Sequence, residues 1–492
     1  MVTRITGLAS GMDIDATVTK LMTAEKAPLT KLTQQKQLVE WKREGYRDVS
    51  TKLVSFLNDK LNNLSLSSSI NAQKATITGN TSAVSATATG AASGGVLNVS
   101  VQGLATATNV KSTTGAGAHA STDALSTVYS GSETSITLNG TSISFSPSDS
   151  IDSFMQKINS NKDAGVTAVF DPSSGKMSLT NKATGNSNLT FSGEALAAFG
   201  LDNTATVAQG ADAQLTVNGL SVTQKSNTFA MNGVTLTLNS VTPTGQSTQI
   251  SVSADTDKLV ATVQSFVDAY NDVLSTLNTK VGEERYPKYA PLTDEQKKDL
   301  SDDEQALWNK KAKSGMLKND DMLQNTISSM RTAMIQGVTL SDGNKVSFAQ
   351  LGITTGTYET RGKLTLDPDK LKTALEKDPN IVNNFFGSQD STALNTNKYT
   401  DQDGILSRMK KVAKSSLESL ASTAGTSKVS SDANSTFLVN SLMGTQITGM
   451  ERRISDWNSR LNTIETNYYK KFTAMETAIS RYNTQSTSLS SL

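Results

Sequence analysis

The chain has 492 residues, enough for several domains, because a single hydrophobic core rarely grows past about 250–300 residues. Its formal net charge of +1 argues against a nucleic-acid-binding protein, and the absence of cysteine excludes disulfides, thiolate metal sites and cysteine nucleophiles. No apolar run approaches the roughly 20 residues that span a bilayer, and Arg4, Asp13 and Asp15 interrupt the place of a cleaved secretory signal. We therefore expect no membrane insertion and, if the protein is exported, a route that removes no leader.

The N-terminal part is predicted to be helical. Ile14, Val18 and Leu21 are spaced for one helical face, and Pro28 is expected to end or kink that helix. A second apolar stripe follows at heptad spacing, which is typical of a coiled coil. The residues of this stripe are Leu32, Val39, Tyr46, Val49, Leu53 and Phe56.

The middle of the chain differs from both ends in charge. Residues 71–254 carry only 16 of the 91 charged side chains and are rich in Ser, Thr, Asn, Gly and Ala. Low net charge and short β-branched runs predict strands rather than disorder. Asn139-Gly140 lies between two alternating runs and predicts a hairpin over Ser135–Phe145. Further runs that predict strands are Val96–Val101, Gly165–Phe170, Lys176–Thr180, Leu215–Val222, Val234–Val241 and Gln249–Val252.

One helix is predicted within this β-rich part. It covers Ile151–Asn159, with Ser148 or Asp149 as its N-cap. The β-segments on either side of 116–204 look like two halves of one domain. We therefore expect residues 116–204 to form an inserted domain.

The region after the β-rich part returns to helical spacing. Apolar residues recur on one face over Leu259–Leu277 and again over Leu323–Met334. Between them, Glu283–Lys313 is charged and polar and contains two prolines. This segment is predicted to be an exposed excursion with a short helix around Asp303–Lys311.

The C-terminal stripe is the longest helical pattern in the chain. An amphipathic helix of this kind cannot bury its stripe alone, and a chain that leaves and returns makes the two terminal helices antiparallel. The stripe consists of Ile447, Met450, Ile454, Trp457, Leu461, Ile464, Tyr468, Phe472, Met475, Ile479 and Tyr482.

These elements predict an α+β multidomain fold. An antiparallel helical coiled-coil stalk is expected from 1–40 and 445–492, and a mixed helical domain from 41–72 and 256–444. A β-rich domain is expected from 73–115 and 205–255. The fourth domain, a β-rich insert in the third, is expected at 116–204.

We find no constellation for catalysis, a cofactor or a metal. His119 is the single histidine, so neither a Ser-His-Asp triad nor a histidine metal cluster can be built. Asp401-x-Asp403-Gly404 resembles part of a calcium loop, but the twelfth position is Val412 instead of a glutamate. A solvated turn before a helix is the favoured interpretation.

Carboxylates alone can still form a glycosidase pair. The candidates are Asp302-Asp303-Glu304 and Asp320-Asp321. Both lie where a helix is expected to start, and acids favour that end of the helix dipole. Caps or surface positions are the favoured interpretation, and we expect no enzyme.

Several motifs, in order, resemble one family. Gly7-Leu8-Ala9-Ser10-Gly11-Met12-Asp13, then Leu21-Met22 and Pro28-Leu29, resemble the N-terminal signature of the flagellar filament cap protein family (FliD, flagellar hook-associated protein 2). Ile151 through Gly165-Val166 is similar to a short motif of flagellin and hook-associated proteins. Segments similar to the rest of the family are Leu97–Val101, Ala211–Ala213, Val217–Gly219, Gly233–Leu238, Phe266–Asn271, Leu351–Ile353, Gly362–Leu364 and Gly404–Leu406.

The resemblance implies a structural protein at the extracellular tip of the flagellum. Family members assemble into a cap, commonly a pentamer, in which the β-rich domains form a plate and the helical domains form legs. Exported flagellin is inserted under the plate. Implied partners are other copies of the chain, flagellin, the hook–filament junction protein and an export chaperone. The residues expected at partner interfaces are Leu8, Met12, Ile14, Val18, Leu21, Ile454, Trp457, Leu461, Ile464 and Tyr468.

A second hypothesis is a surface adhesin that binds host glycans or mucin through the β-rich domains. It makes no use of the terminal stripes, and the aromatic content of 5% does not favour a glycan platform. A secreted carboxylate hydrolase is the third class. The oligomer number, the flagellin specificity, the contacting β-faces and the role of 283–313 stay open at this point.

Overall fold

The computed structural model describes residues 10–490, and the chain forms two compact units. Unit 1 combines the two ends of the chain, Met1–Leu66 and Leu259–Leu492, and unit 2 is Ser67–Lys258. Unit 1 is mainly helical and unit 2 mainly antiparallel β-sheet. The fold is therefore α+β multidomain, as predicted. No helix among the described residues is long and apolar enough to cross a membrane.

The helices of unit 1 include the predicted ones. Apolar faces at 259–277 and 323–334 lie in α6 and α9, and the charged segment contains α8 with a capping box between Ser301 and Glu304. The helical elements are α1 Ile14–Ser55, the π-helical η1 Phe56–Leu61, α2 Asn62–Leu64, α6 Thr256–Gly282, α7 Asp294–Lys298, α8 Asp302–Lys313, α9 Asp321–Ile335, α10 Pro368–Lys377, α11 Ile381–Gly387, α12 Ile405–Ala424 and α13 Leu442–Ser490. Shorter elements are the 3-10 turns η3 Phe348–Leu351, η4 Tyr358–Thr360 and η5 Ser391–Ala393, and the hairpins β16 Val338–Thr339 with β17 Lys345–Val346 and β18 Ile353–Thr355 with β19 Leu364–Leu366.

Helix α1 begins after an N-cap residue, Asp13. The Asp13 carboxylate accepts a hydrogen bond of 2.8 Å from the Ala16 backbone N–H. The helix then runs through Pro28, so of the two predicted outcomes, an end or a kink, the end is wrong. Proline removes one backbone hydrogen bond, to the carbonyl of Ala24, but the helix on both sides packs against α13.

The heptad stripe of α1 faces the interior of unit 1. Tyr46, Val49 and Leu53 are almost fully buried, and α1 contacts both α12 and α13. Helix α12 buries twelve of its twenty residues, polar ones among them, and packs against α1, α9 and α11. It is therefore the central helix of this unit.

Unit 2 contains a β-sandwich. A five-stranded sheet in the order β1-β15-β3-β11-β12 packs its apolar face against a three-stranded sheet, β13-β14-β2. Alternation along each strand sends every second side chain into this core. The strands are β1 Gln73–Gly79, β2 Val84–Ala88, β3 Gly95–Gly103, β11 Ala213–Val217, β12 Leu220–Gln224, β13 Thr228–Met231, β14 Val234–Leu238 and β15 Thr248–Ala254, and α3 Ser67–Ile70 precedes them.

One predicted strand is instead a hairpin. Leu215–Val222 is divided by Asn218 and Gly219, which both have positive φ and form a two-residue turn between β11 and β12. The same turn chemistry joins β5 and β6 at Asn139-Gly140, where the hairpin prediction is confirmed.

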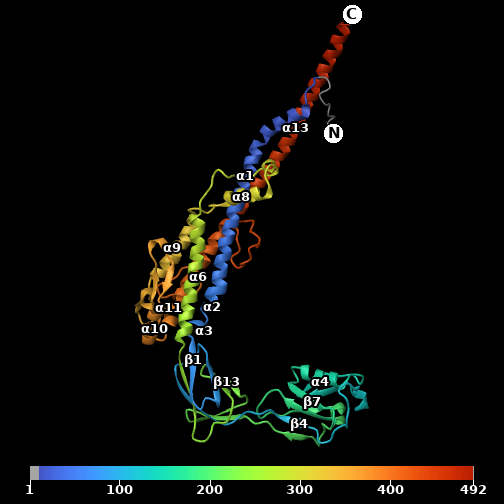
Figure 1. Ribbon diagram of the computed structural model, residues 1–492, viewed down its shortest axis with the longest axis vertical. Helices are drawn as coiled ribbons and strands as arrows, with labels where there is room; N and C mark the ends of the chain where they lie inside the picture. Colours follow the sequence, from blue (N-terminus) through green and yellow to red (C-terminus); the bar gives the residue numbers. More distant parts are fainter. Residues whose placement is uncertain (1–9, 491–492) are drawn as a thin grey trace. The chain divides into compact units, whose positions relative to one another are not determined.

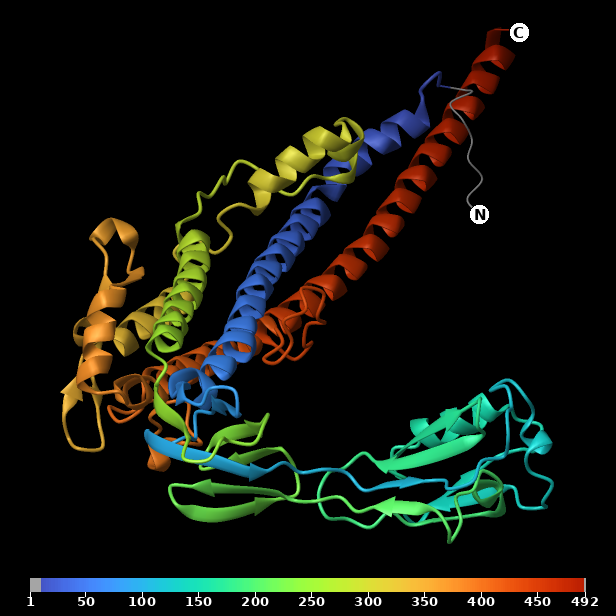
Figure 2. The ribbon, with the colours of Figure 1, turned by 60° about the horizontal axis from the view of Figure 1, so that its bottom comes forward.

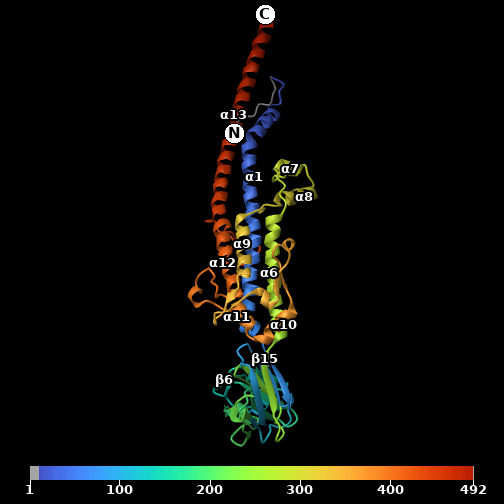
Figure 3. The same cartoon turned by 90° about the vertical axis from the view of Figure 1, so that its left-hand side faces the viewer.

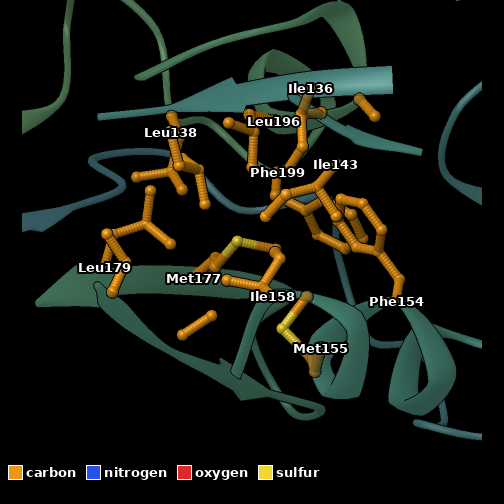
Figure 4. Close-up of a cluster of buried hydrophobic side chains, with 14 of the residues drawn as sticks. Ile136, Leu138, Ile143, Phe154, Met155, Ile158, Met177, Leu179, Leu196 and Phe199 are labelled. Carbon is orange, nitrogen blue, oxygen red and sulfur yellow. The ribbon is translucent and has the colours of Figure 1, made fainter. Parts of the chain in front are cut away.

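A second hydrophobic core of unit 2 lies between a four-stranded sheet, β10-β4-β8-β7, and a three-stranded sheet, β6-β5-β9. Figure 4 shows Ile136 and Leu138 of β5 pointing toward Met177 and Leu179 of β8, with Phe154 of α4 beside them. Figure 2 shows these elements as a group of strands separate from the sandwich. The elements are β4 Asn109–Lys111, η2 Leu125–Thr127, β5 Ser135–Leu138, β6 Thr141–Ser144, α4 Ile151–Ser160, β7 Val166–Asp171, β8 Lys176–Asn181, β9 Phe191–Ser192, α5 Glu194–Ala198 and β10 Thr206–Ala208.

The cap of α4 differs from the prediction. Ser150 is the N-cap and accepts a hydrogen bond from the Ser153 N–H, whereas Ser148 and Asp149 lie before it. The Asp149 carboxylate accepts from the Ser146 N–H and pairs with Lys157. Asp149 thus stabilises the turn before the helix and does not cap the helix itself.

Candidate interface on the terminal helices

Helices α1 and α13 pack against each other in opposite directions (Figure 1). The Ser10 hydroxyl donates to Glu476, the Tyr469 hydroxyl to Asp15 at 2.8 Å, and Lys36 pairs with Glu451 at 3.1 Å. As residue numbers rise along α1, those of the contacting partners fall along α13. The antiparallel arrangement predicted from the two stripes is confirmed.

An apolar cluster holds the two helices together near the start of α1. Its buried members are Ile14, Val18 and Met22 of α1 and Leu461 of α13. Leu29, Ile464, Tyr468, Tyr469 and Phe472 pack against it and are partly buried. Several aromatic side chains of α13 therefore keep part of their surface outside the pair.

Polar and charged side chains also join the two helices. The Tyr468 hydroxyl donates to the Glu25 carboxylate at 3.1 Å, and this hydrogen bond raises the pKa of Tyr468 above its usual range. Lys36 lies 2.7 Å from Glu40 and 3.1 Å from Glu451, and hydrogen bonds to these carboxylates, to Glu40 above all, raise its pKa despite partial burial.

The start of α13 is tied to α1 by a strap, residues 425–441, which connects α12 to α13. The Arg43 guanidinium donates to the Ala424 carbonyl at 2.6 Å and to the Leu438 carbonyl at 2.9 Å. Arg43 and Arg47 both lie over the Phe437 ring, at 4.2 Å and 4.6 Å from its centroid. Burial and the neighbouring Arg47 lower the pKa of Arg43.

The residues predicted at partner interfaces divide into three groups. Ile14, Val18 and Leu461 are buried within the chain by the α1–α13 pair. Met12 and Leu21 are exposed, at 42% and 38%. Ile454, Trp457, Ile464 and Tyr468 are half-buried on α13, and Leu8 lies outside the described residues.

Sequence reasoning missed Met22, Leu29 and Tyr469. Ile14, Val18 and Met22 follow a four-residue step, whereas the prediction took the three-residue step from Val18 to Leu21. Both steps fit one face of a helix, and only the position of the partner helix decides between them. The repeated four-residue spacing through position 22 is a sequence signal that is compatible with Met22, but it does not exclude Leu21.

The carboxylates considered for catalysis lie at the starts of two helices. Asp302 and Asp303 lie in the first turn of α8, and Asp320 is the N-cap of α9. Asp320 also accepts a hydrogen bond from the Tyr46 hydroxyl at 2.5 Å, and burial together with this bond raises the pKa of Tyr46. Within residues 10–490, no group of three or more acidic or histidine side chains is placed to hold a metal ion.

The prediction of a solvated turn at 401–404 is wrong for Asp403. A turn does precede α12, but the Asp403 side chain is fully buried and pairs with Lys411 at 2.6 Å. It also accepts hydrogen bonds from the Thr400 and Asp390 backbone N–H groups and from the Ser407 hydroxyl. This carboxylate organises the turn from inside.

Comparison with known proteins identifies the family. Residues 10–108 match the N-terminal part of flagellar hook-associated protein 2, and residues 210–484 match its C-terminal part. The chain belongs to the flagellar hook-associated protein 2 family. The second core of unit 2 begins at Val110 and ends at Leu201, between the two matched stretches.

Relatives match over most of the chain. Flagellar hook-associated protein 2 of Halalkalibacterium halodurans is 30% identical over 539 residues, covering 99% of this chain and 99% of the relative. Flagellar hook-associated protein 2 of Escherichia coli K12 is 29% identical over 398 residues, covering 76% and 78%. The crystal structure of the flagellar cap protein FliD D1-D2-D3 domains from Escherichia coli matches with a TM-score of 0.55 at 25% identity, covering 83% of this chain and 99% of that one. The chain is thus a flagellar filament cap protein.

Proposed function

We propose that the chain, as a homo-oligomer at the distal end of the filament, promotes the ordered insertion of exported flagellin from outside the cell. The α13 stripe carries this proposal. Ile454, Trp457 and Ile464 are only half-buried in the single chain, and Tyr482 is 70% exposed. An amphipathic helix that remains partly uncovered in the single chain has apolar surface left for a neighbouring subunit.

The proposed partners follow from the family. They are other copies of the chain, in a ring that is commonly five-fold, flagellin, the hook–filament junction protein and an export chaperone. Ten residues are the proposed contact residues: Leu8, Met12, Ile14, Val18, Leu21, Ile454, Trp457, Leu461, Ile464 and Tyr468. Those that α1 and α13 bury against each other act by fixing the pair, and the exposed and half-buried ones act by touching the partner.

We also propose the four-domain division of the chain: a terminal coiled coil, a leg, a plate and an inserted plate domain. The two separate cores of unit 2 support an insert in the plate. Strands β4 and β10 pair with each other and, through β8, complete the second sheet, which favours insert boundaries near 109 and 208. The proposed role is structural rather than enzymatic.

The decisive test removes the α13 stripe. Changing Ile454, Trp457 and Leu461 together to Ser removes apolar side chains worth roughly 1.5–3 kcal/mol each when fully buried. We expect the variant to be made and exported but lost from the tip, so that flagellin accumulates in the medium. Electron microscopy of filaments and assay of the culture supernatant measure both outcomes.

A matched control changes exposed polar residues of the same helix, Ser455, Asn458 and Asn462, to Ala. This variant keeps the stripe and should assemble normal filaments. Normal filament length and motility in the Ser variant would show that the stripe does not anchor the cap.

A further inference from the structure

Two oppositely charged surfaces lie on opposite sides of α1. The first, which we name the acidic segment, is Asp294–Glu304, with six carboxylates and two lysines. The second, which we name the arginine face, is Arg452–Arg460 of α13, with three arginines and one aspartate. Figures 2 and 3 both show α1 between α8 and α13. The two surfaces of one chain therefore face away from each other.

Two contacts with α1 place both surfaces at the same level of that helix. The Gln34 side chain donates to the carbonyl of Pro291, just before the acidic segment, at 2.7 Å. Lys36 pairs with Glu451, the residue before the arginine face, at 3.1 Å. Successive residues of an α-helix are about 100° apart, so Gln34 and Lys36 point in directions about 200° apart while differing by only about 3 Å in height.

Beside the charged groups of each surface lies an apolar side chain that is at least partly exposed. On α8, Leu307 is 65% exposed and lies one turn after Asp303. On α13, Trp457 is half-buried, lies one turn after Arg453, and has the Arg460 guanidinium 5.0 Å from its ring centroid. An apolar centre with a polar rim is the usual composition of a protein interface.

The arginines of this face are available to a partner. Glu451 is engaged by Lys36, and Arg452, Arg453 and Arg460 make no ion pair with a described carboxylate of their own chain. On the other surface, Lys297 pairs with Asp294, and Glu304 accepts from the Ser301 backbone, while Asp302 and Asp303 are exposed. Opposite charge on two exposed helix faces favours contact between them and sets its register.

We propose that the acidic segment of one copy binds the arginine face of the next copy, with Leu307 against Trp457 at the centre. Because the two surfaces lie on opposite sides of α1 at about one height, this head-to-tail contact needs no large shift along the helix between neighbouring copies, and the absence of such a shift is what a closed ring requires. It gives the charged segment a role as the link between neighbouring subunits. The inference rests on the homo-oligomer of the proposed function.

Charge reversal tests the contact. One variant carries Asp299→Lys, Asp302→Lys and Asp303→Lys, a second carries Arg452→Glu, Arg453→Glu and Arg460→Glu, and a third combines all six. We expect each triple variant to associate at least tenfold more weakly than the unmodified protein, and the combined variant or an equimolar mixture of the two to recover. Sedimentation velocity at several protein concentrations measures the association.

Salt and a control variant separate this contact from general charge effects. Association of the unmodified protein should weaken as sodium chloride rises from 50 to 500 mM, because exposed charge pairs are screened. Lys470→Glu with Lys471→Glu reverses a similar charge elsewhere on α13 and should leave association unchanged. Since Lys at the start of α8 opposes its helix dipole, Asp302→Asn with Asp303→Asn is the second acidic variant, and circular dichroism confirms that each protein is folded.

Disulfide trapping gives an independent test, because the chain contains no cysteine. A chain with Asp303→Cys and Arg453→Cys should form a ladder of covalent multimers on oxidation, both in solution and in caps on isolated filaments, whereas Asp303→Cys with Lys470→Cys should not. An oligomer that persists after both triple reversals, or a combined variant that fails to recover, overturns this contact and leaves the proposed oligomer standing. A chain that neither associates nor cross-links in caps counts against both.

Discussion

Arg408 shows how a single buried cation joins separate elements of unit 1. Its side chain is fully buried at the start of α12. The guanidinium lies at the C-terminal end of α9, where backbone carbonyls have no helical partners and carry partial negative charge. It donates hydrogen bonds to the carbonyls of Ala333, Gln336, Gly337, Asp401 and Asp403, at 2.6–3.3 Å.

Changing Arg408 to Ala is expected to destabilise unit 1 by at least about 3 kcal/mol, because each buried carbonyl left without a donor costs about 1–3 kcal/mol. Urea unfolding followed by the helical circular dichroism signal measures this loss. Exposed Arg452→Ala is the control and should change the free energy of unfolding little. An Arg408 variant as stable as the unmodified protein would show that water replaces the lost donors.

Asp403 makes part of the stability of unit 1 depend on pH. Burial alone would raise its pKa, but hydrogen bonds from Lys411, Thr400, Asp390 and Ser407 outweigh burial and hold the pKa below its usual range. A carboxylate with a lowered folded-state pKa contributes stability above its unfolded-state pKa of about 3.9. That contribution is lost as the pH falls through the lower folded-state value.

Asp403→Asn should therefore be less stable than the unmodified protein at pH 7, where it leaves Lys411 buried without its carboxylate. The difference should be constant above about pH 5 and shrink below about pH 4. Acid unfolding curves of both proteins measure it, with exposed Asp401→Asn as the control. A difference that stays constant down to pH 2 would contradict the assigned direction of the pKa shift.

At the scale of elements, helices α12 and α13 differ in how firmly the single chain holds them. Helix α12 buries twelve of its twenty residues, whereas the buried apolar residues described in the much longer α13 are Met443, Ile447 and Leu461. Helices with few buried residues open locally at low free energy. In a monomeric chain the pair of terminal helices is thus the least stable part of unit 1.

Hydrogen exchange on the monomer should be faster in residues 10–40 and 445–490 than in α12, by about a hundredfold if the opening free energies differ by ~3 kcal/mol. Assembly into caps should slow exchange in α13 and leave α12 unchanged, which serves as the internal control. If α13 and α12 were equally protected from exchange in the monomer, the hypothesis that α13 is stabilised only on assembly would be contradicted.

Periodicity predicted helices and strands well where one face is buried by the chain itself. The apolar face of α6 and the hairpin at Asn139-Gly140 depend on local spacing and turn chemistry, and both are present. The continuation of α1 through Pro28 depends on packing against α13, which is hundreds of residues away in sequence. Local propensity cannot report such a partner.

In the candidate interface, too, some residues follow from local spacing and others only from the packing of distant elements. Ile14, Val18 and Leu461 were found from their spacing, and the structure brings them together in one cluster. The choice of Met22 over Leu21 needs the position of α13, since both fit the helical period. The burial of Asp403 likewise depends on packing. Lys411, about two helical turns further along the chain, pairs with the Asp403 carboxylate inside the fold.

At the scale of the whole molecule, the second core of unit 2 is separable from the sandwich. Its residues run from Val110 to Leu201, whereas the sandwich core is built from residues on both sides of that stretch. Strands β4 and β10 enter and leave it side by side, with Asn109 directly opposite Ala208. Neighbouring Cα atoms in such a pair are about 4.5–5.5 Å apart, so a two-residue turn can join them.

Deletion of residues 110–207, with Asn109 and Ala208 joined by Asn-Gly, should leave the sandwich and unit 1 folded. The deletion removes hydrogen bonds from Gly185 to Thr106, from Asn186 to Asp212 and from Thr184 to Lys225, but none of the sandwich's buried core side chains. The remaining protein should unfold in urea at nearly the same midpoint as the corresponding transition of the full chain.

Residues 109–208 expressed alone should fold as well, because both sheets of the second core and α4 lie inside them. A deletion variant that aggregates, or an isolated insert without a cooperative unfolding transition, would show that the two cores fold as one unit.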